Sequence, residues 1–225
     1  IICISIVVVI QSLLFADGGL SALGINVLNM AIITSLVGWL TISLWKKLFG
    51  EANVSILSGS IVAGILSVVF SSIAFVFEYA LGGTVSVPLG KVLIAMLSSH
   101  LLIGLGEGII TALIVSLLLR VRSDLVYIKT DENTKNNKST FYGFFLFLLL
   151  CLTLLTPYAS SSPDGLESVA SEFGFSENSG IVLLLEDYGI SSLNNNFLST
   201  TLSAVLGIVV IIAISNIILK YRTKS

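Results

Sequence analysis

The chain has 225 residues, of which 55% are hydrophobic and 11% are charged, and its mean hydropathy is +1.04. A soluble domain of this size does not need so many apolar residues to bury its core, so lipid is the expected solvent for most of the chain. The formal net charge is −2 and the charged residues are confined to short segments, which argues against nucleic-acid binding, because that function needs a basic face.

Apolar segments suited to membrane spans follow one another along the chain. The expected spans are 1–16, 26–45, 55–81, 91–120, 141–157 and 200–219. Every backbone N–H and C=O in lipid must be bonded within its own segment, and none of these segments shows the strict alternation of a barrel strand. The predicted fold is therefore all-α, a polytopic transmembrane helix bundle.

The first span begins with IICISIVVVI, without an initiating Met or a basic leader. A signal peptide needs a basic region before its apolar stretch and a small-residue cleavage site after it. We therefore expect residues 1–16 to be the outer part of a spanning helix whose beginning lies upstream.

The loop after this span, FADGGLSALGINVLNM, is rich in glycine and carries Asp17 near its start. Paired glycines permit a tight or re-entrant turn. Asn26 and Asn29 lie at the start of the second span, where an Asn side chain either caps the helix or faces a cavity. Capping is the simpler interpretation, but it suits Asn29 less well because this residue is already inside the apolar run.

Small residues in the third and fourth spans indicate close helix packing. Gly104 and Gly108 have the small-xxx-small spacing that lets two helix backbones approach each other. Gly59, Ala63 and Gly64 are expected to have a similar packing role in the third span.

The fourth span also carries two ionisable residues at membrane depth, His100 and Glu107. They are nearly two turns apart, so both project from one stripe of the helix, about 10 Å apart along its axis. The pair lines a polar path from outside, supports a metal-binding segment, or simply bonds to a neighbouring helix and sets its register. One His and one Glu are too few to hold a transition metal, which usually takes about four donors. Glu78, at the outer end of the third span, is expected only to lie at the membrane interface.

A polar linker at 121–140 separates two predicted units. A four-span unit at 1–120 precedes a two-span hairpin at 141–225, whose outer segment, 158–199, is too polar and acidic to enter lipid. No internal repeat relates the two units, so an inverted-repeat transporter has no support.

Basic residues determine the expected orientation. With the loop after Trp45 in the cytoplasm, all 11 basic residues except Lys91 lie on that side, as the positive-inside rule requires. The sequence therefore predicts a multi-pass protein of a cell membrane, with a cytoplasmic C-terminus and with 158–199 outside.

The sequence contains no recognisable catalytic set. It has a single His, no P-loop, no HExxH motif and no cysteine cluster. Cys3 and Cys151 lie inside apolar runs and are expected to act as small hydrophobic residues. We expect neither enzymatic activity nor a cofactor, so energy for active transport has to come from another subunit or from an ion gradient.

Two stretches of the first unit resemble a known family. The runs QSLLFADGGLSALGINVLNMA at 11–31 and HLLIGLGEGIITALIV at 100–115 are similar to the CbiM/NikM family, the substrate-binding membrane subunits of energy-coupling-factor cobalt and nickel transporters. The second unit resembles a small accessory component of these transporters, which is named for a motif found here as PDGLE at 163–167.

The resemblance implies a prokaryotic uptake system for cobalt or nickel that works with a transmembrane coupling subunit and cytoplasmic ATPases. In the family the ion is held by an N-terminal Met-His segment and a further His, which are expected upstream of Ile1, so no metal ligand is assigned in this chain. Residues that orient such ligands or line the ion's path are the candidates here: Asp17, Asn26, Asn29, His100 and Glu107.

Two other functions stay open. A vitamin-capturing subunit of the same transporter class would need an aromatic-lined pocket. An intramembrane enzyme would use His100 and Glu107 as an acid-base pair, although no nucleophile accompanies them.

Overall fold

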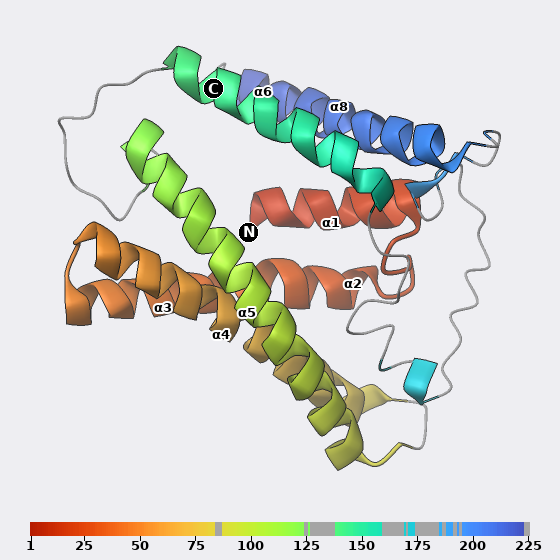
Figure 1. Ribbon diagram of the computed structural model, residues 1–225. Helices are drawn as coiled ribbons and strands as arrows, with labels where there is room; N and C mark the ends of the chain where they lie inside the picture. Colours follow the sequence, from red (N-terminus) through yellow and green to blue (C-terminus); the bar gives the residue numbers. More distant parts are fainter. Residues whose placement is uncertain are drawn as a thin grey trace.

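The protein is described by a computed structural model (Figure 1), in which the described part of the chain is helical and contains no strand. The described residues are 1–83, 87–123, 126, 138–158, 169, 171–173, 185, 188–190, 193 and 195–222. The predicted all-α class is confirmed. The PDGLE motif at 163–167 and most of the linker at 121–140 lie outside the described residues.

The helices follow the predicted spans but are mostly longer. The first unit contains α1 (Ile2–Phe15), α2 (Leu23–Asn26), the π-helix η1 (Val27–Ile33), α3 (Thr34–Phe49), α4 (Asn53–Gly82) and α5 (Leu89–Val121). The second contains α6 (Lys138–Leu155), the 3₁₀-helix η3 (Thr156–Tyr158) and α8 (Asn196–Arg222). The second span thus begins before Asn26, and it contains a π-helical stretch that hydropathy did not predict.

Four helical stretches of the described chain are long and apolar enough to cross a membrane. They are Leu23–Phe49, Asn53–Gly82, Leu89–Val121 and Asn196–Ile214. The two remaining apolar helices, Ile2–Phe15 and Tyr142–Tyr158, are shorter, and the 14 residues of α1 extend only about 21 Å. The structure is therefore that of a multi-pass membrane protein. That the two shorter helices also cross the membrane stays a prediction.

Basic residues gather where helices end at one side of the bundle. Lys46 and Lys47 close α3, Arg120 closes α5 and Lys220 lies near the end of α8, and these helix ends lie on the same side in Figure 1. Positive charge at a helix C-terminus also complements the helix dipole. The segregation agrees with the positive-inside pattern, and a cytoplasmic location for this side stays a prediction.

Glycines allow α4 and α5 to cross with their backbones in contact, as the spacing of Gly104 and Gly108 predicted. A Cβ atom added to Gly108 would lie 2.6 Å from the Ile61 carbonyl oxygen, and one added to Gly64 would lie 2.6 Å from the Gly108 Cα. A Cβ atom added to Gly104 would lie 3.2 Å from the Cα and the carbonyl oxygen of Ile65. This crossing sets the angle at which α5 presents Glu107, the neighbour of Gly108.

The two predicted units share an apolar cluster. Ile10 and Phe15 of α1 pack with Leu185 and with Val210 and Ile211 of α8. A Cβ atom on Gly207 would lie 3.2 Å from the Phe15 ring, so α8 and the end of α1 are in close contact. Figure 1 shows α6 and α8 side by side, and α8 is the one that packs against α1.

Candidate functional site

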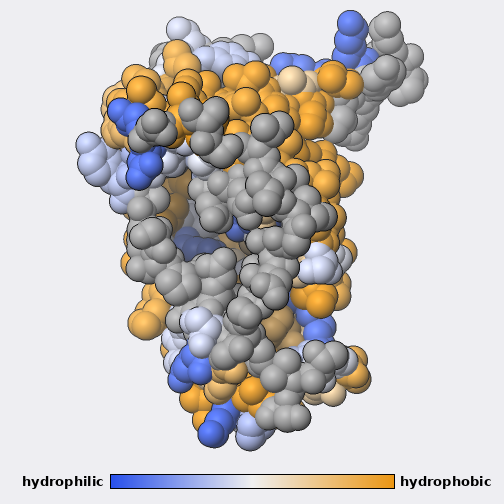
Figure 2. Space-filling view, turned by 90° about the vertical axis from the view of Figure 1, so that its right-hand side faces the viewer, coloured by the Kyte–Doolittle hydropathy of each residue, from blue (hydrophilic) through white to orange (hydrophobic). Residues whose placement is uncertain are grey.

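A cavity of about 860 Å³ lies between α1, η1, α3, α4 and α5. The residues predicted to line a path or to orient metal ligands all contribute to its wall: Asp17, Asn26, Asn29, His100 and Glu107. Figure 2 faces the end of the molecule at which α1 ends and shows a hollow with hydrophilic residues inside it. The fold therefore brings together the five candidates from three different stretches of the chain.

The turn after α1 forms one edge of the cavity. Ala16, Gly18 and Gly19 have positive φ angles of 59°, 72° and 69°, so the paired glycines do form the predicted tight turn. Asn26 Nδ2 donates a hydrogen bond to the Gly18 carbonyl at 2.9 Å. Capping was the wrong interpretation for Asn26, because its side chain makes no cap bond and instead holds the preceding turn.

Asp17 in this turn accepts hydrogen bonds from both units of the chain. Its Oδ2 atom accepts one bond from Gln11 Nε2 at 3.0 Å and a second from the Tyr188 hydroxyl at 2.5 Å. Burial raises the pKa of Tyr188 to about 12, and the hydrogen bond to the negative Asp17 carboxylate acts in the same direction. The sequence pattern indicated Asp17 as a candidate but gave no sign of Gln11 or Tyr188.

The Tyr188 ring has a second contact with the same turn. It stacks on Phe15 with 4.5 Å between ring centroids and an interplanar angle of 19°. Tyr188 also has a φ of 57°, a left-handed conformation that is unfavourable for a side chain of this size. The stacking and the hydrogen bonds to Asp17 and Gln11 hold the residue in this conformation. No local pattern in 158–199 could have identified Tyr188, because its partners lie in α1 and in the turn that follows it.

Asn29 lies on η1 and is bonded to α4. Its Nδ2 donates to Glu78 Oε2 at 2.9 Å, and its backbone carbonyl accepts from Ser71 Oγ at 3.2 Å. The expectation that Glu78 has only an interfacial role was wrong, because the carboxylate turns inward and bonds to a buried Asn side chain. One sequence signal that could have indicated this face of α4 is Ser71, which lies about two turns before Glu78 on the same helix and also bonds to Asn29.

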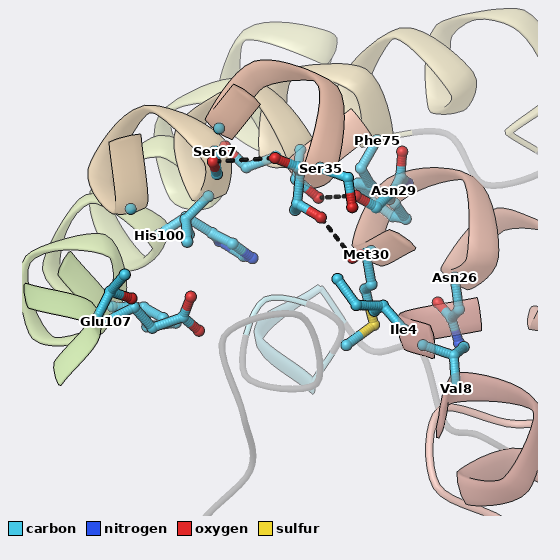
Figure 3. Close-up of a pocket in the computed structure, with 18 of the residues that line it drawn as sticks. Ile4, Val8, Asn26, Asn29, Met30, Ser35, Ser67, Phe75, His100 and Glu107 are labelled. Atoms are coloured by element: carbon cyan, nitrogen blue, oxygen red, sulfur yellow. Dashed lines mark hydrogen bonds between the residues drawn. The ribbon is translucent and has the colours of Figure 1, made fainter. Parts of the chain in front are cut away.

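His100 and Glu107 enter the cavity from α5. Figure 3 shows both side chains pointing into the cavity, with Met30, Ile4 and Val8 across from them. His100 Nδ1 lies 2.9 Å from the Met96 carbonyl oxygen, which can only accept, so Nδ1 donates in this hydrogen bond and Nε2 is left for another contact. Among the described residues, Glu107 has no hydrogen-bond or ion-pair partner.

Hydroxyl groups account for much of the remaining polar wall. Ser67, for example, donates to the carbonyl oxygens of Thr34 and Ala63 at 3.1 and 2.6 Å. The hydroxyl-bearing lining residues are Thr34, Ser35, Ser60, Ser67, Ser71, Ser72 and Thr111. Within the described residues, no group of three or more His, Cys, Asp or Glu side chains is arranged to hold a metal ion.

Long apolar helices around a cavity that carries a few polar and ionisable side chains are those of a multi-pass membrane protein. Residues 1–125 match the family model described as the CbiM cobalt uptake substrate-specific transmembrane region, and residues 138–224 match the PDGLE domain. The first match covers more than half of the chain, so the protein belongs to the CbiM family, with a PDGLE domain fused to it. The resemblance noted in the sequence is confirmed.

The chain is similar to two proteins assigned as fused nickel transport proteins and to one assigned as a cobalt transport protein. The chain is 27% identical over 98% of its length to a protein of Archaeoglobus fulgidus assigned as a fused nickel transport protein, NikMN, and covers 71% of it. It is 31% identical over 69% of its length to a Lactiplantibacillus plantarum protein assigned as a fused nickel transport protein, LarMN, and covers 48% of it. It is 26% identical over 60% of its length to the cobalt transport protein CbiM of Clostridioides difficile and covers 54% of it. No solved structure matches the chain.

Proposed function

We propose that the protein is the membrane-embedded, substrate-capturing subunit of an ATP-driven importer of cobalt or nickel. The observation that carries this proposal is the convergence of Asp17, Asn26, Asn29, His100 and Glu107 on one cavity. Polar groups at membrane depth are costly unless they are paired, hydrated or used. A cavity that gathers them from separate helices supports a site for a small hydrated cation.

His100 and Glu107 are proposed to act along the ion's path. An imidazole whose Nδ1 bonds to the Met96 carbonyl leaves Nε2 for an ion, and cobalt and nickel accept nitrogen donors readily. Glu107, without a partner among the described residues, adds a negative charge deeper on the same helix face. Two such groups can hold an ion transiently but are too few for a closed site.

Asp17 and Asn26 are proposed to position the outer turn over the cavity.

Tyr188 of the PDGLE domain contacts this turn through Asp17 and Phe15. We therefore propose that the domain holds the turn in the conformation in which metal is loaded. Deleting 141–225 is expected to abolish metal uptake while leaving membrane insertion intact. Unchanged uptake by the shortened protein would refute this role of the domain.

The energy for import is assigned to partners. The described residues form no nucleotide-binding motif, and in the family the cycle is driven by a transmembrane coupling subunit and cytoplasmic ATPases. We propose that this chain assembles with subunits of both kinds. Co-purification with them from cells that express the complete operon tests the proposal, and purification of the chain alone, without either kind of subunit, would count against it.

Uptake assays in cells that express the complete operon test the function itself. Cells supplied with radioactive cobalt or nickel are expected to accumulate the ion, and each unlabelled ion should compete with the labelled one. The ion that competes at the lower concentration is the preferred substrate. Uptake no greater than that of cells without the operon would refute the proposal.

The two alternative functions are less well supported by the cavity. Among the described residues that line the cavity, Phe75 is the only Phe, Tyr or Trp, whereas a vitamin site would need an aromatic wall. An enzyme that uses His100 and Glu107 would lose all turnover when either is replaced, while a capture subunit is expected to keep reduced uptake.

A further inference from the structure

The pair formed by Asn29 and Glu78 has two oxygen atoms for which the protein provides no donor. Asn29 Nδ2 donates to Glu78 Oε2 at 2.9 Å, which ties η1 to α4. Asn29 is 6% exposed, and the atoms left over, Asn29 Oδ1 and Glu78 Oε1, are both enclosed and have no hydrogen-bond partner among the described residues. Buried oxygen atoms are rarely left in this state, since removal from water without a new partner is unfavourable.

The charge of Glu78 also lacks compensation within the described chain. Its recorded partner is a neutral amide, and no basic side chain of the described residues forms an ion pair with it. Glu78 lies one turn before the end of α4 at Gly82, where the free carbonyl groups of the helix carry partial negative charge. A positive charge beside the enclosed Oε1 of Glu78 would stabilise the carboxylate in this position.

The backbone of Asn29 is held firmly enough to form one side of a binding site. Its carbonyl oxygen accepts the backbone N–H of Thr34, the five-residue bond of a π-helix, and also the Ser71 hydroxyl. π-Helical turns of this kind occur frequently at functional sites. Figure 3 shows Asn29 beside Phe75 at the wall of the cavity.

We propose that Asn29 Oδ1 and Glu78 Oε1 together bind a monovalent cation of the size and hardness of sodium. Amide and carboxylate oxygens suit hard cations, while cobalt and nickel bind more readily to nitrogen. The pair carries one formal negative charge, which a monovalent ion neutralises and a divalent ion would exceed. Sodium sites in membrane proteins are commonly built where helices depart from regular geometry. The site is separate from the transported metal and does not depend on the proposed function.

Binding of radioactive sodium to the complete protein, purified in detergent, is the direct test. Choline replaces sodium so that ionic strength stays constant. We expect saturable binding of one sodium per chain, and a rise in Tm of about 3 °C when sodium reaches ten times its Kd. The absence of saturable binding, together with equal Tm values in sodium and choline, would overturn the proposal.

Glu78→Gln keeps the shape of the side chain and removes its charge, so sodium should bind at least tenfold more weakly. Glu51→Gln is the matched control, because Glu51 is an exposed carboxylate paired with Lys46 at 2.7 Å, and this variant should bind sodium normally. The binding assay on the unaltered protein decides the matter if Glu78→Gln does not fold. Undiminished binding by a folded Glu78→Gln variant would overturn the proposal. Displacement of bound sodium by an equimolar amount of cobalt or nickel would also overturn the proposal. So would a protein that is stabilised against thermal unfolding by acid but not by sodium.

Discussion

The Tyr188 hydroxyl donates a hydrogen bond to the carboxylate of Asp17, a residue 171 positions earlier in the chain. Asp17 lines the cavity and lies in the turn that follows α1, while Tyr188 belongs to the PDGLE domain. One contact therefore links the fused domain to the edge of the candidate substrate cavity. Because Gln11 donates to the same carboxylate oxygen, the contact also constrains the last turns of α1.

Removing only the hydroxyl of Tyr188 tests this link. Tyr188→Phe keeps the stacking on Phe15 but removes the bond to Asp17, so we expect the free energy of unfolding to fall by about 1–3 kcal/mol and metal uptake to fall with it. Tyr158→Phe is the control, because Tyr158 is 78% exposed and packs only edge-on against Phe197. Equal behaviour of the two variants in uptake and thermal unfolding would show that the Tyr188 hydroxyl has no special role.

Alkaline titration gives a second test of the same contact. The folded protein holds the Tyr188 proton up to a pKa of about 12, against the ordinary value of 10.0. The stabilising contribution of this phenol is complete below pH 10.0, and it is lost as the pH rises from there to about 12, because the unfolded chain releases the proton first. When the native protein is titrated with base, the tyrosinate absorbance should therefore show a step near pH 12. This step should be missing in Tyr188→Phe.

Asp17→Asn refines this titration. The variant removes the negative charge but leaves Tyr188 buried, so the pKa of Tyr188 should move only part of the way back towards its ordinary value. A pKa unchanged from that of the original protein would mean that burial alone is responsible.

Two replacements of His100 separate the roles of its ring nitrogens. His100→Asn places a donor near the position of Nδ1, where it can still reach the Met96 carbonyl, whereas His100→Gln places a polar group nearer the position of Nε2. If Nε2 serves the ion, both variants should weaken uptake in the cell assay, and His100→Gln should retain more of it. Full uptake with His100→Asn would contradict a role for Nε2.

Glycine replacements on α5 test the helix crossing. Gly108→Ala brings a Cβ atom within 2.6 Å of the Ile61 carbonyl, and we expect a loss of about 1–3 kcal/mol in the free energy of unfolding. Gly106→Ala is the matched control on the same helix, because no atom lies within 4 Å of its added Cβ. This control should be neutral or slightly stabilising, since Ala favours the helix by about 1 kcal/mol. Thermal unfolding in detergent compares the two variants, and similar Tm values would argue against close packing at Gly108.

Local sequence patterns were enough to predict the helices and the faces on which some of them pack. Apolar length predicted the spans, because a backbone in lipid can satisfy its polar groups only within a helix. The Gly104 and Gly108 spacing predicted the contact with α4, and the seven-residue spacing of His100 and Glu107 placed both on the face that lines the cavity. Each of these features depends on residues within one helix.

Tertiary structure alone decided which polar side chains meet. Asn26 bonds to Gly18 instead of capping its helix, Asn29 bonds to Glu78, and Asp17 bonds to Tyr188. The reason is physical: hydropathy and helical period belong to single segments, whereas a hydrogen bond between segments depends on how far each helix is shifted and rotated against its neighbour. The π-helical turn at Val27–Ile33 shifts that register by inserting a residue, and it orients Asn29 in a way that no local rule could specify.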